Sequence, residues 1–262
     1  MELSNRYPRF ITPDFRPYDV IEISNITRSI VCRHVKRVEE RKYTDFYVAG
    51  VYRGIVTGCV VGCNLRCFFC WSPISRDFPE RFGEFYSSTK VAEILCNLAK
   101  HHRIRKARLS CGEPTICPQH LIEVLEYIEK CRDIELFILE TNGIIMGIDE
   151  SIVKKISNYS KVYVRVSLKA GRPEKFEERT GARREFFELP FRAIKYLLRH
   201  GVKFHVAAMT DPRIMSVDER RELINKLASI DPWLAQWLEE EDIDPYRTTL
   251  FRLRKAGVKL KW

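Results

Sequence analysis

From about residue 53 onward, short apolar stretches alternate with longer segments of helical period, and this alternation constrains the fold more than any other feature. Strands are expected near 53–58, 106–110, 136–141, 162–169, 204–209 and 248–252. Helices are expected near 88–102, 118–132, 150–158, 189–200 and 217–229, with Gly201 ending the fourth. Alternation of this kind favours a parallel sheet that is covered by helices on both faces. The sequence therefore predicts an α/β fold.

Composition narrows the setting of the protein. The 262 residues are 45% hydrophobic, which is enough for a full core. No apolar run approaches the length of a bilayer span, and the N-terminus lacks the apolar stretch of a signal peptide. All nine cysteines lie at or before Cys131, which is unlike a secreted disulfide scaffold, so we expect a cytoplasmic protein with reduced thiols and no membrane partner. The net charge of +10 gives weak support to nucleic acid as a partner, because basic residues are interleaved with 35 acidic ones.

Three cysteines follow the first predicted strand at C-x3-C-x2-C spacing, namely Cys63, Cys67 and Cys70. This spacing suits three corners of a cubane iron–sulfur cluster and leaves one iron open, whereas ferredoxin runs use four thiolates per cluster. A structural zinc site needs four closed ligands, usually in two C-x2-C halves. Cys59 could complete a set of four, but no partner half follows. The spacing therefore favours a cluster with an open iron, which is a binding site for a small molecule.

The cysteine run resembles the C-x3-C-x-Φ-C signature of the radical S-adenosylmethionine (SAM) superfamily, with Phe69 at the aromatic position. The resemblance implies a [4Fe-4S] cluster, bound by the three cysteines as the catalytic metal ligands, whose open iron is chelated by SAM. It implies that the reduced cluster cleaves SAM reductively and that a 5′-deoxyadenosyl radical then abstracts hydrogen from a substrate. The expected architecture is a partial (β/α)6 TIM-like barrel over residues 51–262, with residues 1–50 as an N-terminal extension packed on the barrel.

Other unusual residues also fall on the predicted parallel strands. Active sites of parallel α/β barrels lie at the carboxyl ends of the strands. The cysteine loop follows the first strand, residues 111–114 follow the second, residues 140–143 close the third and residues 167–169 close the fourth, while His205 lies on the fifth. The sequence therefore predicts one site that is built from several loops.

The superfamily resemblance continues in these segments. Residues 112–114 look like the G-G-E-P motif that cradles the SAM amino group, with Cys111 in place of the first glycine. Residues 140–143 resemble the D-T-N-G segment of glycyl-radical-enzyme activases such as the pyruvate formate-lyase activating enzyme. Residues 167–170 resemble the D-L-K segment of the same activases, and residues 176–181 resemble a later F-x-x-x-T-G segment.

The resemblance also gives roles to single residues. Lys169 corresponds to a lysine that reaches the SAM carboxylate, and Phe69 would lie along the adenine. Ser167 replaces an aspartate that helps to hold a monovalent cation, which puts that cation site in doubt. His205 corresponds to a histidine that contacts the SAM ribose, with a core histidine as the alternative. The residues expected to bind SAM are Phe69, Gly112, Glu113, Pro114, Thr141, Asn142, Ser167, Lys169 and His205.

The six remaining cysteines are scattered through separate predicted elements and are expected to be small buried hydrophobic residues. The alternatives are a fourth ligand at Cys59, or a redox-active pair formed by Cys111 and Cys117. Two loops, 72–87 and 171–185, are expected to select the substrate. Trp233 and Trp237, which precede an acidic run at 239–242, could form a docking patch, although such residues more often cap a core.

The leading functional hypothesis is a radical SAM oxidoreductase of the activating-enzyme type, which acts on a partner protein and receives electrons from a reductant such as flavodoxin or ferredoxin. The resemblance of residues 140–143 and 167–170 to activases is the reason for this hypothesis. Radical modification of a small metabolite or of an RNA base is the alternative. A non-catalytic iron–sulfur electron carrier is a third possibility, which the open iron argues against.

Overall fold

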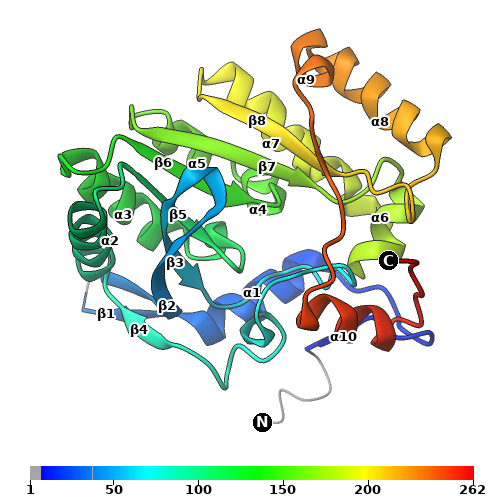
Figure 1. Ribbon diagram of the computed structural model, residues 1–262, viewed down its shortest axis with the longest axis horizontal. Helices are drawn as coiled ribbons and strands as arrows, with labels where there is room; N and C mark the ends of the chain where they lie inside the picture. The colour runs from blue at the N-terminus through cyan, green and yellow to red at the C-terminus, as the bar shows by residue number, and fades with distance from the viewer. Residues whose placement is uncertain (1–6, 37) are drawn as a thin grey trace.

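A nine-stranded sheet forms the centre of the protein (Figure 1). The computed structural model describes residues 7–36 and 38–262. Within this part, the strand order is linear and runs from β1 to β9 without closing into a full barrel. Its parallel strands are β3 (Ile55–Val60), β5 (Lys106–Ser110), β6 (Leu136–Thr141), β7 (Val162–Leu168), β8 (Phe204–Met209) and β9 (Glu239–Glu241). The prediction of an α/β fold with a partial (β/α)6 barrel is confirmed.

Antiparallel strands extend the sheet on the β3 side. β2 (Val38–Ala49) pairs with β3, and it also pairs with β1 (Cys32–Val35) and with β4 (Glu84–Tyr86). The expected N-terminal extension comprises residues 1–50. Its second half is therefore continuous with the barrel sheet. Residues 1–6 of that segment lie outside the described residues.

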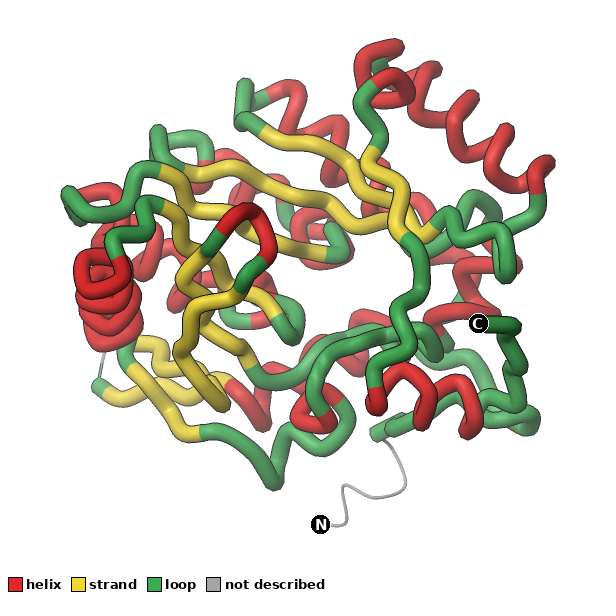
Figure 2. Tube along the Cα trace, in the orientation of Figure 1, coloured by secondary structure: helices red, strands yellow, loops and turns green. Residues whose placement is uncertain are grey.

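Most of the helices form an outer layer along the curved sheet, whereas α10 lies apart from it (Figure 2). The helices are α1 (Val20–Val31), α2 (Ser88–His102), α3 (Pro118–Lys130), α4 (Ile144–Ile148), α5 (Glu150–Ile156), α6 (Pro173–Thr180), α7 (Glu188–Arg199), α8 (Val217–Ile230), α9 (Pro232–Gln236) and α10 (Arg247–Lys255). Side-chain caps start several of them: the Ser87 hydroxyl accepts from the Lys90 N–H, and the Ser216 hydroxyl accepts from the Glu219 N–H. Gly201, with φ of 63°, follows the end of α7. No helix in the described residues combines the length and the apolar character needed to cross a membrane.

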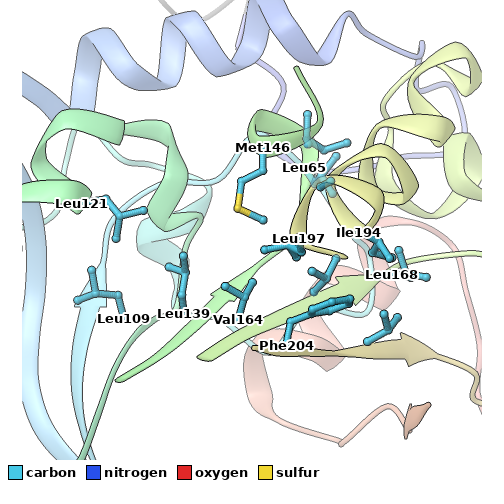
Figure 3. Packing of buried hydrophobic residues seen from close by; sticks show 14 of the residues in the cluster. Leu65, Leu109, Leu121, Leu139, Met146, Val164, Leu168, Ile194, Leu197 and Phe204 are labelled. Atoms are coloured by element: carbon cyan, nitrogen blue, oxygen red, sulfur yellow. The ribbon is translucent and has the colours of Figure 1, made fainter. Parts of the chain in front are cut away.

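The main core lies between the parallel strands and these helices. Leu109, Leu139, Val164 and Phe204 come from four neighbouring strands and point to the same side of the sheet (Figure 3). Helical side chains, including Ile194, belong to the same buried cluster. Burial of each such side chain contributes about 1.5–3 kcal/mol to folding. This layer fixes the strands whose carboxyl ends carry the candidate site.

The predicted strand at 248–252 is wrong. These residues belong to α10, and the buried positions of that helix, Thr249, Arg252 and Leu253, have helical spacing. The sixth parallel strand is instead β9, which consists of three glutamates. An acidic triplet has no apolar alternation, so its pairing with β8 could not be read from the pattern.

All six cysteines outside the C-x3-C-x2-C run are paired in disulfides, so the prediction that they are reduced, buried thiols is wrong. The bonds join Cys32 to Cys117, Cys59 to Cys111 and Cys96 to Cys131, and their Cα atoms lie 6.0, 5.2 and 6.4 Å apart. The suggested Cys111/Cys117 pair does not exist, because each residue is bonded elsewhere. Cys59 is likewise engaged and is not free to bind iron as a fourth ligand.

Loss of the Cys96–Cys131 bond should lower the free energy of unfolding. The bond links α2 to the end of α3 across 35 residues, and a constraint of this length limits the unfolded chain. We expect the double variant Cys96→Ser/Cys131→Ser to lose about 2–4 kcal/mol. Urea unfolding checks this value, with the unreduced parent protein as the reference. Unchanged stability would contradict the prediction.

Stability should also depend on His120, which is buried where α3 meets β2. Its Nδ1 lies 2.9 Å from the Glu39 carbonyl oxygen and its Nε2 lies 2.8 Å from the Tyr43 hydroxyl. The neutral ring fits both partners: Nδ1–H donates to the carbonyl and Nε2 accepts from the hydroxyl. Burial, reinforced by Arg41, lowers the pKa of His120 to about 4.

An unfolded histidine titrates near pH 6.5, so between about pH 6.5 and 4 the unfolded chain binds more protons than the folded one. The free energy of unfolding should therefore fall by about 2–3 kcal/mol as the pH drops through this window. In His120→Gln, which cannot titrate there, that part of the fall should vanish. Unfolding measured at pH 7 and pH 5 in both proteins tests this, and parallel pH profiles would contradict it.

Candidate active site

The three cysteines lie in the segment that follows β3 and leads to β4. In residues 7–36 and 38–262 the free cysteines are Cys63, Cys67 and Cys70. β3 is buried along its whole length, and the loop begins where this strand ends, at the carboxyl edge of the sheet. There the Arg66 N–H donates to the Thr180 carbonyl at 2.8 Å, which joins the loop to the end of α6. The loop is thus held on two sides before any cofactor binds.

A cavity of about 630 Å³ opens beside this loop. All three free cysteines line it, and so do residues from the ends of β5, β6, β7, β8 and β9. A volume of this size is in the range of cavities that hold cofactors and small ligands. Most of the residues predicted to bind SAM line it: Phe69, Gly112, Glu113, Thr141, Asn142, Ser167 and Lys169.

Two predicted residues are absent from the described cavity lining. Pro114 turns its carbonyl to the buried Arg41, which donates to it at 2.8 Å. His205 lies near the start of β8, where its Nε2 is 2.6 Å from a carboxylate oxygen of Glu239. The structure thus brings Glu239, rather than His205, to the cavity from this part of the sheet.

The turn at 111–114 lies against the start of the cysteine loop. The Glu113 N–H donates to the Gly62 carbonyl at 2.9 Å. A Cβ atom at Gly112 would stand 2.2 Å from the Gly62 carbonyl oxygen, so only glycine allows this approach. Cys111, at the place of the family's first glycine, has φ of 75° and is bonded to Cys59. The disulfide therefore anchors a residue whose conformation is unfavourable for a side chain.

The Glu113 carboxylate connects two of the predicted segments. Its Oε1 accepts from the N–H and hydroxyl of Thr115 at 3.1 and 2.7 Å and from the Thr141 hydroxyl at 2.7 Å. Its Oε2 accepts from the Asn142 N–H at 2.8 Å. Glu113 therefore fixes the 112–114 turn against residues 141–142, and Oε2 keeps the capacity for one more donor.

Asn64 is a site residue that the sequence reasoning missed. Its Oδ1 accepts from the Asn142 amide at 2.7 Å, and its own amide donates to the Ser24 hydroxyl at 3.0 Å. The Asn142 amide also lies 3.8 Å from the Cys63 sulfur. Hydrogen bonds to sulfur ligands tune a cluster, so this chain of amides orients the first cysteine.

Paired charges form a wall of the cavity. Arg108 on β5 binds Glu140 on β6 at 2.6 Å, and the Ser110 hydroxyl donates to the same carboxylate at 2.5 Å. Arg165 on β7 binds Glu239 and Glu241 on β9 at 2.7 and 2.8 Å. The two arginines were missed, although charged residues inside apolar strand patterns were a visible signal. Glu140 stands at the aspartate position of the D-T-N-G segment, and here its charge is already balanced by Arg108.

The three thiols differ in their electrostatic surroundings. Burial raises the pKa of Cys67 to about 12, while burial and then Glu113 raise the pKa of Cys63. Burial acts in the same direction on Cys70, but Arg76 and Arg252 outweigh it and lower the pKa of that thiol. Cys70 is therefore the cysteine best prepared to bind metal as a thiolate, and metal binding would displace protons from the other two.

The residues fit the expected cluster. In the part of the chain that the structure describes, no group of three or more His, Cys, Asp or Glu side chains is placed to hold a single metal ion. A cubane cluster binds each thiolate through a different iron atom, so its ligands stand farther apart than those of one ion. The three free thiols share one loop and line one cavity, as the ligands of one cluster must.

Comparisons with known proteins point in the same direction. The family model described as the Radical SAM superfamily matches residues 59–228. GTP 3′,8-cyclase of Clostridium perfringens (strain SM101 / Type A) is 30% identical over 117 residues, which are 45% of this chain and 34% of the cyclase. The chain thus matches about a third of the length of that relative.

Solved structures share the fold. Streptococcus suis SuiB bound to S-adenosylmethionine matches 77% of this chain and 42% of its own, with a TM-score of 0.56 and 18% identity. TYW1 with a lysine-pyruvate adduct bound matches 86% of this chain and 82% of its own, with a TM-score of 0.55 and 15% identity.

The family match covers well over half of the chain. It contains the cysteine loop and the lining segments at 111–113, 140–142 and 167–169. Proteins of this family use a [4Fe-4S] cluster and SAM, and the residues described above fit both. The chain belongs to the radical SAM superfamily.

Proposed function

We propose that the enzyme removes a hydrogen atom from a small polar substrate that binds between the cysteine loop and the wall of paired charges. One observation carries this proposal: the same cavity of about 630 Å³ is lined by the three free cysteines and by Arg108, Glu140 and Arg165. A radical site needs a substrate that is fixed in position and shielded from water. The oriented charges of the cavity wall supply the first of these conditions.

When bound, the reduced cluster and SAM supply the 5′-deoxyadenosyl radical as the hydrogen-abstracting group. The protein's own residues orient these groups. Lys169, whose Nζ donates to the Ser167 hydroxyl at 2.5 Å, offers its charge at the cavity wall to the SAM carboxylate. Phe69 offers an apolar surface to the adenine, and the 112–113 turn offers backbone groups and Oε2 of Glu113 to the SAM amino group.

The charge-paired wall also indicates the chemistry of the substrate. Arg108 uses Nε and Nη1 in its bonds to Thr57 and Glu140, and its Nη2 has no partner among the described residues. Arg165 uses Nε and Nη2 in its bonds to Glu239 and Glu241, and its Nη1 has no partner among the described residues. Two unpaired guanidinium nitrogens suit a substrate with oxygen acceptors. Because the lining also carries Glu240, Asp242 and Asp244, a neutral acceptor such as the carbonyl of a base fits better than a carboxylate or a phosphate. This supports a metabolite or an RNA base as the substrate.

Activation of a partner protein is the second candidate. The similarity of residues 140–143 and 167–170 to activase segments favours it, and one structure with the same fold is SuiB bound to its precursor peptide SuiA. The balanced charge of Glu140 and the serine at 167 are departures from the activase pattern. A flavodoxin or ferredoxin as the reductant completes the proposal under either candidate.

Electron paramagnetic resonance on anaerobically reconstituted, reduced protein, with and without SAM, is the first test. A [4Fe-4S] signal that shifts on addition of SAM supports chelation at an open iron, whereas an unshifted signal would favour an electron carrier. Deuterium transfer from labelled candidate substrates to 5′-deoxyadenosine then separates the two substrate classes. Transfer from a small molecule with the enzyme alone supports the proposal. Transfer that requires a partner protein would overturn it in favour of activation.

A further inference from the structure

Each cysteine of the loop has its backbone carbonyl held by a different buried arginine. Arg66 Nη1 donates to the Cys63 carbonyl at 2.6 Å, and Arg76 Nη1 donates to the Cys67 carbonyl at 2.9 Å. Arg252 Nη1, from α10, donates to the Cys70 carbonyl at 2.6 Å. The exposed fractions of Arg66, Arg76 and Arg252 are 0, 2 and 2%. We call these three residues the arginine clamp.

The positive charge of the clamp exceeds the negative charge of the carboxylates that contact it. Asp77 is the one carboxylate in ion-pair contact with it in the described residues: it binds Arg76, and it binds Arg252 at 2.5 Å. Among residues 7–36 and 38–262, the Arg66 guanidinium contacts only backbone carbonyls and the ring of Tyr7, and its Nη2 has no partner there. Three guanidiniums and one carboxylate leave an excess of two positive charges in a buried place. Uncompensated buried charge is costly, so the site is complete only with an anionic group.

A cluster held by three thiolates is such a group. With three thiolates, the oxidised cluster has a net charge of about −1. The one-electron-reduced cluster has a net charge of about −2. A positive surrounding therefore stabilises the reduced form more than the oxidised form. The excess charge of the clamp matches the reduced cluster.

We propose that the arginine clamp is a positioning and redox-tuning device, which holds the three ligand carbonyls and raises the reduction potential of the cluster. The proposal rests on the cluster and not on the identity of the substrate. Arg252 lies beyond residue 228, where the family match ends, so α10 adds to the site a residue that the matched domain lacks. The clamp thereby links the C-terminal helix to the chemistry of the loop.

A redox titration of the reconstituted holoenzyme, followed by the paramagnetic signal of the reduced cluster, tests this proposal. In Arg252→Gln, the ratio of reduced to oxidised cluster at the wild-type midpoint should fall about tenfold, which equals about 59 mV for a one-electron couple. Asp77→Asn removes the negative charge and should shift the potential in the opposite direction. Arg252→Lys keeps the charge but not the fork of donors, so the potential should stay close to the wild-type value while less iron is retained per chain.

The matched control is Arg172→Gln, which breaks an exposed ion pair with Glu222 and should leave the potential unchanged. A merely structural role would not give shifts of opposite sign for Arg252→Gln and Asp77→Asn. Unchanged potentials in both variants, or shifts in the same direction, would overturn the proposal. Should Arg252→Gln fail to fold, as judged by circular dichroism of the apoprotein, Asp77→Asn decides alone: no positive shift means that the proposal is wrong.

Discussion

Cys67→Ser should bind no stable [4Fe-4S] cluster and should lose more than about a hundredfold of its SAM cleavage, because even residues behind a metal ligand often change activity by 10–100-fold. Cys67 is buried, lines the cavity and is unbonded to any other cysteine. A serine in its place offers a much weaker ligand for iron, and two thiolates do not hold a cubane. Iron and sulfide content, together with 5′-deoxyadenosine formed under reducing conditions, measure the effect.

The double variant Cys96→Ser/Cys131→Ser is the matched control, because it removes two cysteines that do not line the cavity in the described residues. It should lose stability and yet keep a full complement of iron. A Cys67→Ser protein with wild-type iron content would show that this cysteine is not a ligand. In that event the assignment of the loop as a cluster site would fail.

Gly112→Ala should disrupt the turn at 111–114. The added Cβ would stand 2.2 Å from the carbonyl oxygen of Gly62 and 2.8 Å from that of Val60. Both atoms are backbone: Val60 ends the buried strand β3, and Gly62 is buried just beyond it, so neither can move aside cheaply. We expect a loss of about 1–3 kcal/mol in the free energy of unfolding. We also expect weaker SAM binding, because the turn and the cysteine loop would be forced apart.

Urea unfolding and the SAM-induced change in the paramagnetic signal measure the two effects of Gly112→Ala. Gly50→Ala is the matched control, since a Cβ at Gly50 meets nothing within 4 Å and φ at this residue is −74°. The control should match the wild type in both measurements. A Gly112→Ala protein that also matches the wild type would contradict the close approach of the two loops.

Some parallel strands could be predicted to the residue. The expected bounds 106–110, 136–141 and 204–209 are those of β5, β6 and β8, because strands that are buried over most of their length are rich in apolar side chains. β9 could not be predicted in this way. Two of its three glutamates are held by Arg165, which lies more than seventy residues earlier in the chain, and local patterns carry no such information.

The site residues also differ in how far the sequence could predict them. Cys63, Glu113 and Lys169 lie in short motifs, so the sequence alone could nominate them. Arg252 could not be nominated, because its role depends on a carbonyl that is 182 positions away and belongs to no motif. The disulfide between Cys32 and Cys117, 85 residues apart, was hidden for the same reason, since spacing does not encode which cysteines meet.

The bond between Cys59 and Cys111 has a consequence for how the cluster is assembled. Cys59 stands four residues before Cys63 and, as a free thiol, would compete for the open iron. Once it is joined to Cys111, iron delivered to the loop meets three thiols and no fourth. The disulfide thus keeps Cys59 from occupying the open coordination site of the iron. We therefore expect the disulfide to form before the cluster is inserted.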